Sequence, residues 1–428
     1  MTSDKKQKPW LDRFQTTLRV GFFLAFRQVI RSNKWTTALI IFVMMLTFLN
    51  LVVVSGILVG LIEGATQAVK GRYIGDLAIS SLIDKPYIEQ SPSIIKVVEN
   101  MEGVEAVTAR YAESGKIESD YKKSKKASEL SKQVGTIISG IDPEKEDRVT
   151  GISKLLVEGE YLEKDDYDQV LIGAFLLTKY LQFESPGFPT LDNVEIGSKV
   201  RVSVNGIMRE VTVKGILKSK VDEVDRRVFF TDTQFQRMIG RSDNNVDEIA
   251  VKLKPKVDPV LIKNQLVARG FDKYARIQTF EEGQPKFLKD IKETFNMLGN
   301  AISAIGVVVA SITIFIVIFI NAITRRKFIG ILKGIGIDGA SIEFAYVIQS
   351  LFYAVIGVFL GVIFVFLFLQ PYIAAHPINF PFSDGILVAT AFGTTVRALV
   401  LFVATLIAGY IPAKIVVKQN TLDAILGR

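Results

Sequence analysis

Residues 35–62 read WTTALIIFVMMLTFLNLVVVSGILVGLI and contain no charged side chain. An α-helix rises about 1.5 Å per residue, so this run is longer than the roughly 30 Å hydrocarbon core of a bilayer requires. The apolar region of a secretory signal peptide would be only about 7–15 residues long and would precede a small-residue cleavage site. The run therefore predicts a helix that spans a membrane.

Three more apolar runs follow later in the chain, the third closed by Gln370-Pro371 and the fourth by Pro412. We predict membrane helices at residues 35–62, 294–324, 343–370 and 385–411. Apolar residues make up 49% of the chain, yet 22% of the residues are charged, so a soluble part must accompany these helices. Residues 63–293 have the composition of that soluble part. The fourth run contains Arg397, which we interpret as snorkelling to the outer interface; a functional intramembrane charge is the alternative.

The basic residues predict the orientation of the chain. Lys and Arg gather in residues 1–34, 325–342 and 412–428, whereas the loop at 371–384 has neither. Short cytoplasmic segments of membrane proteins are enriched in Lys and Arg, so these three segments are expected inside. Both termini are then cytoplasmic, and residues 63–293 are extracytoplasmic.

The N-terminal segment combines an apolar stripe with basic residues. The stripe has helical spacing and consists of Trp10, Phe14, Leu18, Phe22, Ala25 and Val29, interleaved with four arginines. This pattern is typical of an amphipathic helix lying in the inner membrane interface. A helix packed on a partner protein is the alternative.

The soluble segment shows the same strand–helix–strand order near both of its ends. The first set is expected at 76–83, 91–101 and 104–111, with Ser91 as helix cap, and the second at 248–253, 258–268 and 274–279. Two such units predict a split ferredoxin-like subdomain. The residues between them, about 134–240, are predicted to form a β-rich insertion in which Asn205-Gly206 makes a hairpin turn.

Two segments of the soluble part allow a functional interpretation. Residues 112–133 are rich in Lys, Ser and Glu, which predicts a solvated loop; contact with anionic lipid or a partner is the alternative. Phe183 and Phe188 lie in an apolar loop among turn residues. That loop is either an ordinary packed loop or a contact for substrate or partner.

Several kinds of chemistry find no support in the composition. The chain has no cysteine, which excludes disulfides and thiolate sites, and its single histidine, His376, is expected to be inert. No G-x-x-x-x-G-K-[ST] motif for binding phosphate is present, and no nucleic-acid motif is recognisable. We therefore predict no catalytic, cofactor or metal site in this chain.

Residues 324–338 read TRRKFIGILKGIGID. This segment resembles the signature loop of FtsX-like permeases, R-x-x-E-I-G-I-L-K-A-L-G, although Phe328 stands where that pattern has a carboxylate. Ile329, Ile331, Leu332 and Ile335 offer an apolar face for docking into a cleft on an ATPase. The residues that the resemblance assigns to coupling are Arg325, Arg326, Phe328, Ile329, Gly330, Leu332, Lys333 and Gly336.

The resemblance extends along the chain. Residues 139–143, 170–173 and 197–200 are similar to the outer domain of MacB and lipoprotein-releasing permeases, and residues 410–414 with 422–425 are similar to the end of that family. The chain is thus identified as a member of the FtsX/MacB-type ABC permeases. The implied fold is an α-helical membrane protein with four transmembrane helices and a large α+β extracytoplasmic domain.

The resemblance also implies partners and a location. ATP and Mg are expected on a separate cytoplasmic ABC ATPase, and a second permease completes a homo- or heterodimer in the bacterial cytoplasmic (inner) membrane. Members of the family also meet membrane lipid, an extracytoplasmic carrier, an adaptor or an outer-membrane channel. The implied function is export or extraction of a lipid-linked or amphiphilic substrate. The alternatives are an FtsX-type regulator that activates cell-wall hydrolases without transport, and a membrane-anchored hydrolase.

Overall fold

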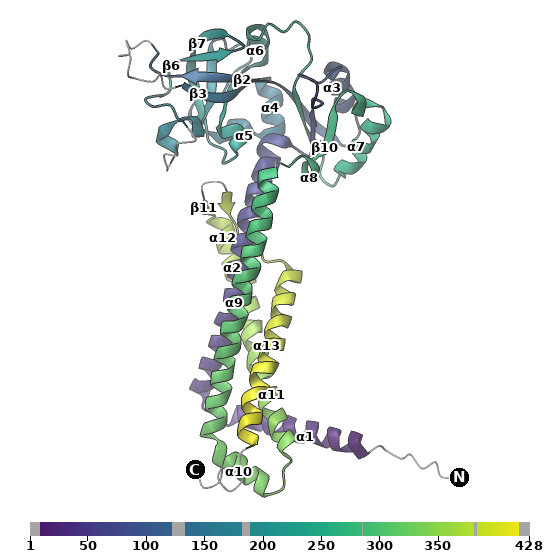
Figure 1. The fold of residues 1–428 in the computed structure, drawn as a ribbon, viewed down its shortest axis with the longest axis vertical. Helices are drawn as coiled ribbons and strands as arrows, with labels where there is room; N and C mark the ends of the chain where they lie inside the picture. The colour runs from purple at the N-terminus through teal and green to yellow at the C-terminus, as the bar shows by residue number, and fades with distance from the viewer. Residues whose placement is uncertain (1–8, 122–132, 182–188, 285, 381–382, 419–428) are drawn as a thin grey trace, which may run out of the picture. The chain divides into compact units, whose positions relative to one another are not determined.

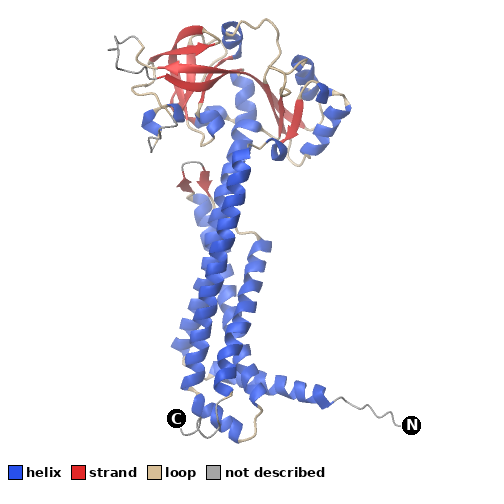
Figure 2. Ribbon diagram, in the orientation of Figure 1, coloured by secondary structure: helices blue, strands red, loops and turns tan. Residues whose placement is uncertain are grey.

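The computed structural model describes residues 9–121, 133–181, 189–284, 286–380 and 383–418 (Figure 1). The chain divides into two compact units. The helical unit comprises Met1–Ile62, Ile291–Asn379 and Asp384–Arg428. The sheet unit comprises Glu63–Asp290 and Phe380–Ser383. Figure 2 shows helices in blue and strands in red.

Within the described residues, four helices are long and apolar enough to cross a membrane. They are built from α2 (Lys34–Val69) with the π-helix η1 (Lys70–Ile74), α9 (Lys286–Thr324), α11 (Gly339–Phe364) with the π-helix η6 (Val365–Leu369) and α12 (Gln370–Ala375), and α13 (Ala391–Val417). Two further helices are α1 (Pro9–Ile30) and α10 (Arg326–Gly334), and a small ribbon is formed by β11 (Ile378–Phe380) and β12 (Ser383–Gly385).

Several helix ends differ from the predicted ones. Pro371 does not end the third helix, because the π-helix η6 leads directly into α12 and the helix continues to Ala375. Pro412 lies inside α13, which continues to Val417 with Pro412 itself buried. The fourth helix starts at Ala391 rather than at 385. The helix α9 starts at Lys286 rather than at 294, since Lys and Glu continue a helix as well as apolar residues do.

Small residues let α11 and α2 approach closely. A Cβ added at Gly357 would lie 2.5 Å from the Cβ of Met44, and one added at Gly361 would lie 2.5 Å from Cδ1 of Phe48. Small residues at such positions are a common basis of helix packing in membranes. Phe48 and Tyr353 are fully buried in the core that results.

The helix α1 forms as predicted, but the predicted stripe is not one exposed face, since Phe22 is exposed whereas Ala25 is buried and Val29 packs on the core. Among residues 15–30 of this helix, the exposed large apolar side chains are Phe22, Phe23, Phe26 and Ile30. Gly21 faces α11, since a Cβ added there would lie 2.8 Å from Cδ1 of Phe344. One face of α1 is therefore covered by α11, and the apolar face remains open.

The sheet unit contains a ten-stranded sheet. Its strands are β1 (Leu77–Ser80), β2 (Val104–Glu118), β3 (Gln133–Ile141), β4 (Leu156–Gly159), β5 (Gln169–Gly173), β6 (Lys199–Val204), β7 (Ile207–Leu217), β8 (Arg227–Thr231), β9 (Glu248–Leu253) and β10 (Arg276–Thr279). Its α-helices are α3 (Ser91–Glu99), α4 (Pro143–Thr150), α5 (Asp222–Asp225), α6 (Asp232–Met238), α7 (Pro259–Ala268) and α8 (Phe280–Gly283).

One end of this sheet has the predicted ferredoxin-like order. The strands run β10-β1-β9-β2, and each neighbouring pair is antiparallel. In β1–α3–β2 the strand β9 lies between the two parallel strands, and in β9–α7–β10 the strand β1 does so. This is the split β-α-β arrangement, and it confirms the expectation from the repeated strand–helix–strand order.

The long strand β2 joins this subdomain to the insertion. Residues 104–110 pair with β9, and residues 110–118 pair with β3. The prediction of a solvated loop from residue 112 is therefore wrong up to Glu118, because Ile117 is fully buried and the polar residues around it belong to a paired strand. Residues 122–132 lie outside the described part of the chain.

The predicted hairpin turn is confirmed, and one predicted helix cap is wrong. Asn205 and Gly206 between β6 and β7 have φ of 49° and 81°, as a type I′ turn requires. Ser91 does not cap α3, since it is the first residue of that helix and its hydroxyl accepts a hydrogen bond from the Val246 N–H at 2.9 Å. Asp258 caps α7 by accepting from the Val260 N–H at 2.9 Å.

Candidate functional site

The short helix α10 carries most of the residues predicted to couple to an ATPase, and its apolar residues divide between two faces. Ile329 and Leu332 are 1% and 7% exposed and belong to the core of the helical unit. Phe328, Ile331 and Ile335 are 50%, 51% and 71% exposed. Their spacing of three and four residues places these three on one side of the helix. We call Phe328, Ile331 and Ile335 the α10 face.

The α10 face corrects the predicted docking surface. The sequence suggested that Ile329 and Leu332 would contact the partner together with Ile331 and Ile335. Because Ile329 and Leu332 are buried, they do not contact a partner at this surface. They pack in the core and hold α10 in place. Phe328, which departs from the family pattern, belongs to the exposed face.

Two further predicted residues hold α10 rather than face outward. The Lys333 ammonium donates to the Val417 carbonyl at 2.9 Å, at the carboxyl end of α13, where a cation is favourable. Gly336 has φ of 93° and ends α10 in a Schellman motif. In this motif the Gly336 N–H donates to the Lys333 carbonyl and the Ile337 N–H to the Leu332 carbonyl. These contacts hold the carboxyl end of α10 in place.

The remaining predicted residues have simpler positions. Arg325 precedes the first turn of α10, Arg326 begins it, and both are partly buried, while Gly330 is buried beside Ile329. Phe183 and Phe188 lie outside the described residues. The structure therefore brings the α10 residues together and leaves the apolar loop as a prediction.

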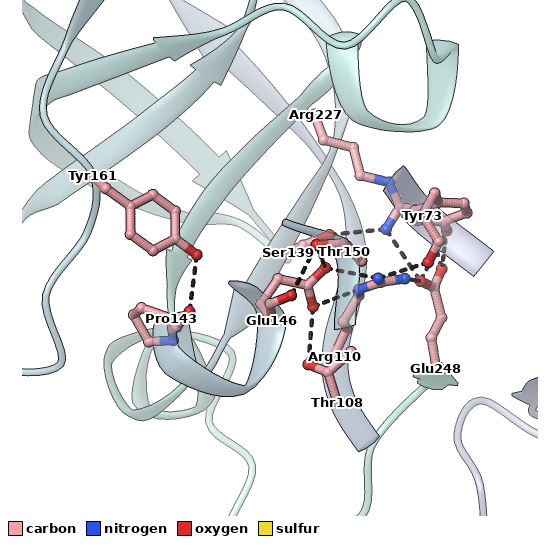
Figure 3. A network of polar contacts seen from close by, with 10 residues as sticks. All are labelled: Tyr73, Thr108, Arg110, Ser139, Pro143, Glu146, Thr150, Tyr161, Arg227 and Glu248. Atoms are coloured by element: carbon pink, nitrogen blue, oxygen red, sulfur yellow. Dashed lines mark hydrogen bonds and ion pairs between the residues drawn. The ribbon is translucent and has the colours of Figure 1, made fainter. Parts of the chain in front are cut away.

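A second site, not predicted from the sequence, is a network of buried charges in the sheet unit (Figure 3). The Arg110 guanidinium of β2 makes two bonds to the Glu146 carboxylate of α4, at 2.7 and 3.0 Å, and both side chains are about 2–3% exposed. Thr108 and Thr150 donate to the same carboxylate at 2.9 and 3.2 Å. Glu146 is thus satisfied on both oxygens.

The π-helix η1 enters this network through Tyr73. The Tyr73 hydroxyl donates to Glu248 of β9 at 2.8 Å, and the Tyr73 carbonyl accepts from Arg110 at 2.8 Å. Arg227 of β8 pairs with Glu248 at 3.0 Å. The Arg110 and Arg227 guanidinium carbons lie 4.6 and 4.8 Å from the centre of the Tyr73 ring, within cation–π range. Figure 3 shows Tyr73 beside the guanidinium groups of Arg110 and Arg227.

Two arginines and two glutamates balance the charge of the network. Burial by itself would raise the pKa of Glu248, but the guanidiniums of Arg227 and Arg110, together with hydrogen bonds from Arg227 and Tyr73, lower that pKa to about 2. The Glu248 carboxylate is therefore ionised at neutral pH. The arrangement holds elements together and offers no free nucleophile or base. Among the residues that the structure describes, no cluster of His, Cys, Asp and Glu could hold a metal ion.

Sequence reasoning missed this network because its members are far apart in the chain. Tyr73 and Glu248 are 175 residues apart, and Arg110 and Glu146 are 36 residues apart. Arg110 lies between Ala109 and Tyr111 in the predicted strand 104–111, and a charged residue at that position was a weak signal.

Comparison with known families agrees with both units. Residues 37–269 match the family described as MacB-like periplasmic core domain, and residues 300–421 match the FtsX-like permease C-terminal family. The first match alone covers more than half of the chain. The chain is a permease of the FtsX/MacB type. Four apolar helices with a large α+β extracytoplasmic domain are the architecture expected from the sequence, and this expectation is confirmed.

The permease is also similar to individual proteins. It is 25% identical over 199 residues to the macrolide export ATP-binding/permease protein MacB of Haemophilus ducreyi. That alignment covers 45% of this chain and 27% of the relative, so the chain spans about a quarter of the relative's length.

Solved structures of parts of other proteins are also similar to part of the permease. The periplasmic region of MacB from Actinobacillus actinomycetemcomitans is 16% identical, with 50% of this chain and 92% of that chain covered and a TM-score of 0.35. The extracellular domain of the ABC-type transporter YknZ from Gram-positive bacteria is 13% identical, with 47% and 99% covered and a TM-score of 0.31. A domain of a permease from Porphyromonas gingivalis is 16% identical, with 49% and 93% covered and a TM-score of 0.32.

Proposed function

We propose that this permease is the non-catalytic membrane subunit of an ABC transporter whose ATPase is a separate cytoplasmic protein that binds ATP and Mg. The α10 face carries the proposal, because three large apolar side chains stay exposed on a helix whose other side is buried. Such a face is stabilised by an apolar groove on a partner protein. The basic residues Arg325, Arg326 and Lys327 put this helix on the cytoplasmic side.

By the same rule we expect both termini in the cytoplasm and the sheet unit outside the cytoplasmic membrane. The helix α2 contributes its residues from Glu63 onward to the sheet unit, and η1 continues it. Tyr73 then ties η1 to β2, β8 and β9 through the buried network. A displacement of α2 driven by the ATPase would therefore move these strands directly.

The work that this motion performs is export or extraction of a lipid-linked or amphiphilic substrate. A second permease, identical or related, completes the transporter, and an extracytoplasmic carrier, an adaptor or an outer-membrane channel receives the substrate. Phe183 and Phe188 remain our candidates for contact with the substrate or with such a partner. Regulation of cell-wall hydrolases is the competing function. A regulator of this kind would also work with a separate cytoplasmic ATPase.

Co-purification from native membranes tests the proposal. The ATPase should accompany the wild-type chain and should be lost in an Ile331→Glu variant, since a carboxylate would be buried in the apolar groove. Lys327→Ala, a substitution at an exposed position beside Phe328, serves as the matched control. An intact and active complex without any ATPase would overturn the proposal, and activation of a cell-wall hydrolase without release of an amphiphile would favour the regulator.

A further inference from the structure

Arg397 is a cation inside a predicted membrane span. It lies six residues after Ala391, the first residue of α13, which is about 9 Å along the helix. Its guanidinium donates to the hydroxyl of Ser55 on α2, and Ser55 is only 7% exposed. The arginine side chain itself is half-buried. It therefore sits in the seam between α2 and α13 rather than in open solvent.

The seam is shaped to hold this guanidinium. A Cβ added at Gly393 would lie 2.8 Å from Nη1 of Arg397 and 2.9 Å from the Thr390 hydroxyl, so the absence of a side chain there makes room for the arginine. The residues before α13 close the seam at one end. The Val388 N–H donates to the Gly56 carbonyl of α2 at 3.1 Å, and Leu387 packs on Gly56.

The described part of the chain provides neither a carboxylate for Arg397 nor a hydrogen-bond partner for every polar group of the seam. A guanidinium has five N–H donors, and one hydroxyl acceptor, that of Ser55, is bonded to it. No described carboxylate lies within ion-pair distance of Arg397. Thr394, one turn earlier and 5% exposed, has a buried hydroxyl without a hydrogen-bond partner among the described residues. A charge in apolar surroundings is costly without an anion, so the seam calls for an anionic group from outside the chain.

We propose that Arg397, assisted by Thr394, binds the phosphate of a glycerophospholipid at the outer end of α13. A planar guanidinium matches the oxygens of a phosphate in a bidentate geometry. The lipid source follows from the surface of α13 beside Arg397, where Val396 and Val400 are 43% and 41% exposed and can hold acyl chains. The inference rests on α13 being a membrane span and is independent of ATPase coupling.

The test uses the full-length protein, stripped of lipid by detergent exchange. Dioleoyl phosphatidylglycerol should raise the midpoint of thermal unfolding of the wild type and of Arg397→Lys. Arg397→Gln should lose this shift. Dioleoylglycerol, which has the same acyl chains without phosphate, and inorganic phosphate without acyl chains should each leave the wild-type midpoint unchanged. Arg31→Gln is the control for a basic residue elsewhere in the helical unit and should respond as the wild type does.

Two further readouts keep the outcome unambiguous. Native mass spectrometry of the purified protein should show a retained phospholipid in the wild type that Arg397→Gln lacks. Without added lipid, Arg397→Gln should unfold at the same temperature as the wild type or higher, because an unbalanced charge has been removed. An equal lipid shift in the wild type and Arg397→Gln would overturn the proposal, as would an equal response to inorganic phosphate alone.

Discussion

Arg110 and Glu146 are the most deeply buried ion pair in the described sheet unit, and both have several hydrogen bonds. Removing one member leaves the other charge buried and unpaired, so Arg110→Leu should lower the free energy of unfolding by about 3–5 kcal/mol. Chemical denaturation of the full-length protein in detergent measures this. Lys145→Ala breaks a half-exposed pair with Glu99 and should cost less than about 1 kcal/mol. Equal losses in the two variants would mean that the network is not a structural clasp.

The Glu248 carboxylate predicts a dependence of stability on pH. Its pKa is lowered to about 2 in the folded state, so the folded state binds fewer protons than the unfolded state below the usual glutamate pKa. The stabilisation is complete above about pH 4.5 and is lost as the pH falls toward 2. Because Glu248 is 26% exposed, we expect a loss of roughly 2–3 kcal/mol.

Calorimetry of the wild type between pH 6 and pH 3 should therefore show a falling unfolding temperature. Glu248→Gln should show a weaker dependence, whereas Glu102→Gln, at an exposed position, should follow the wild type. Parallel curves for all three proteins would contradict the assignment of the acid sensitivity to Glu248.

At the scale of elements, the contact of α11 with α2 depends on two glycines. Gly361→Leu should destabilise the helical unit, because even a Cβ would lie 2.5 Å from the Phe48 ring. Phe48→Ala in the same chain should recover part of the loss by vacating that space. Gly334→Ala is the control, since nothing lies within 4 Å of a Cβ added there. Thermal unfolding in detergent distinguishes the variants. If the destabilisation of the double variant equals the sum of the two single effects, Gly361 and Phe48 are not in contact.

The helix α10 offers a prediction about coupling. Gly330 is buried beside Ile329, so a bulky residue there should push α10 out of position without disturbing the sheet unit. Gly330→Leu should reduce substrate release per ATP hydrolysed, while the sheet unit keeps its unfolding transition. Measurement of both rates in reconstituted membranes checks this, and wild-type coupling in the variant would show that the position of α10 does not matter.

The elements also show which features a single sequence predicts well. Local signals such as the Asn205-Gly206 turn and the uncharged runs led to the right elements, because each depends on neighbouring residues. The continuation of β2 to Glu118 was missed, since its pairing with β3 and β6 outweighs its polar composition. The division of α10 into two faces depends on packing against distant helices and could not be predicted either.

At the scale of the whole molecule, the natural absence of cysteine makes the orientation testable. A single cysteine at Ile83, which is 96% exposed in the sheet unit, should react with a membrane-impermeant thiol reagent applied to spheroplasts. A single cysteine at Ile335, which is 71% exposed, should react only after the membrane is permeabilised. The opposite pattern would invert the orientation and remove α10 from the reach of a cytoplasmic ATPase.

The most direct test of the account is cross-linking from the α10 face in native membranes. A single cysteine replacing Ile331, which is 51% exposed, carries a photoactivatable thiol reagent that is added to inside-out vesicles. The account predicts a product that joins this permease to an ABC ATPase, and no such product from a cysteine at Ile83. Cross-linking of Ile331→Cys to lipid alone, in vesicles that still perform ATP-dependent release of an amphiphile, would contradict it.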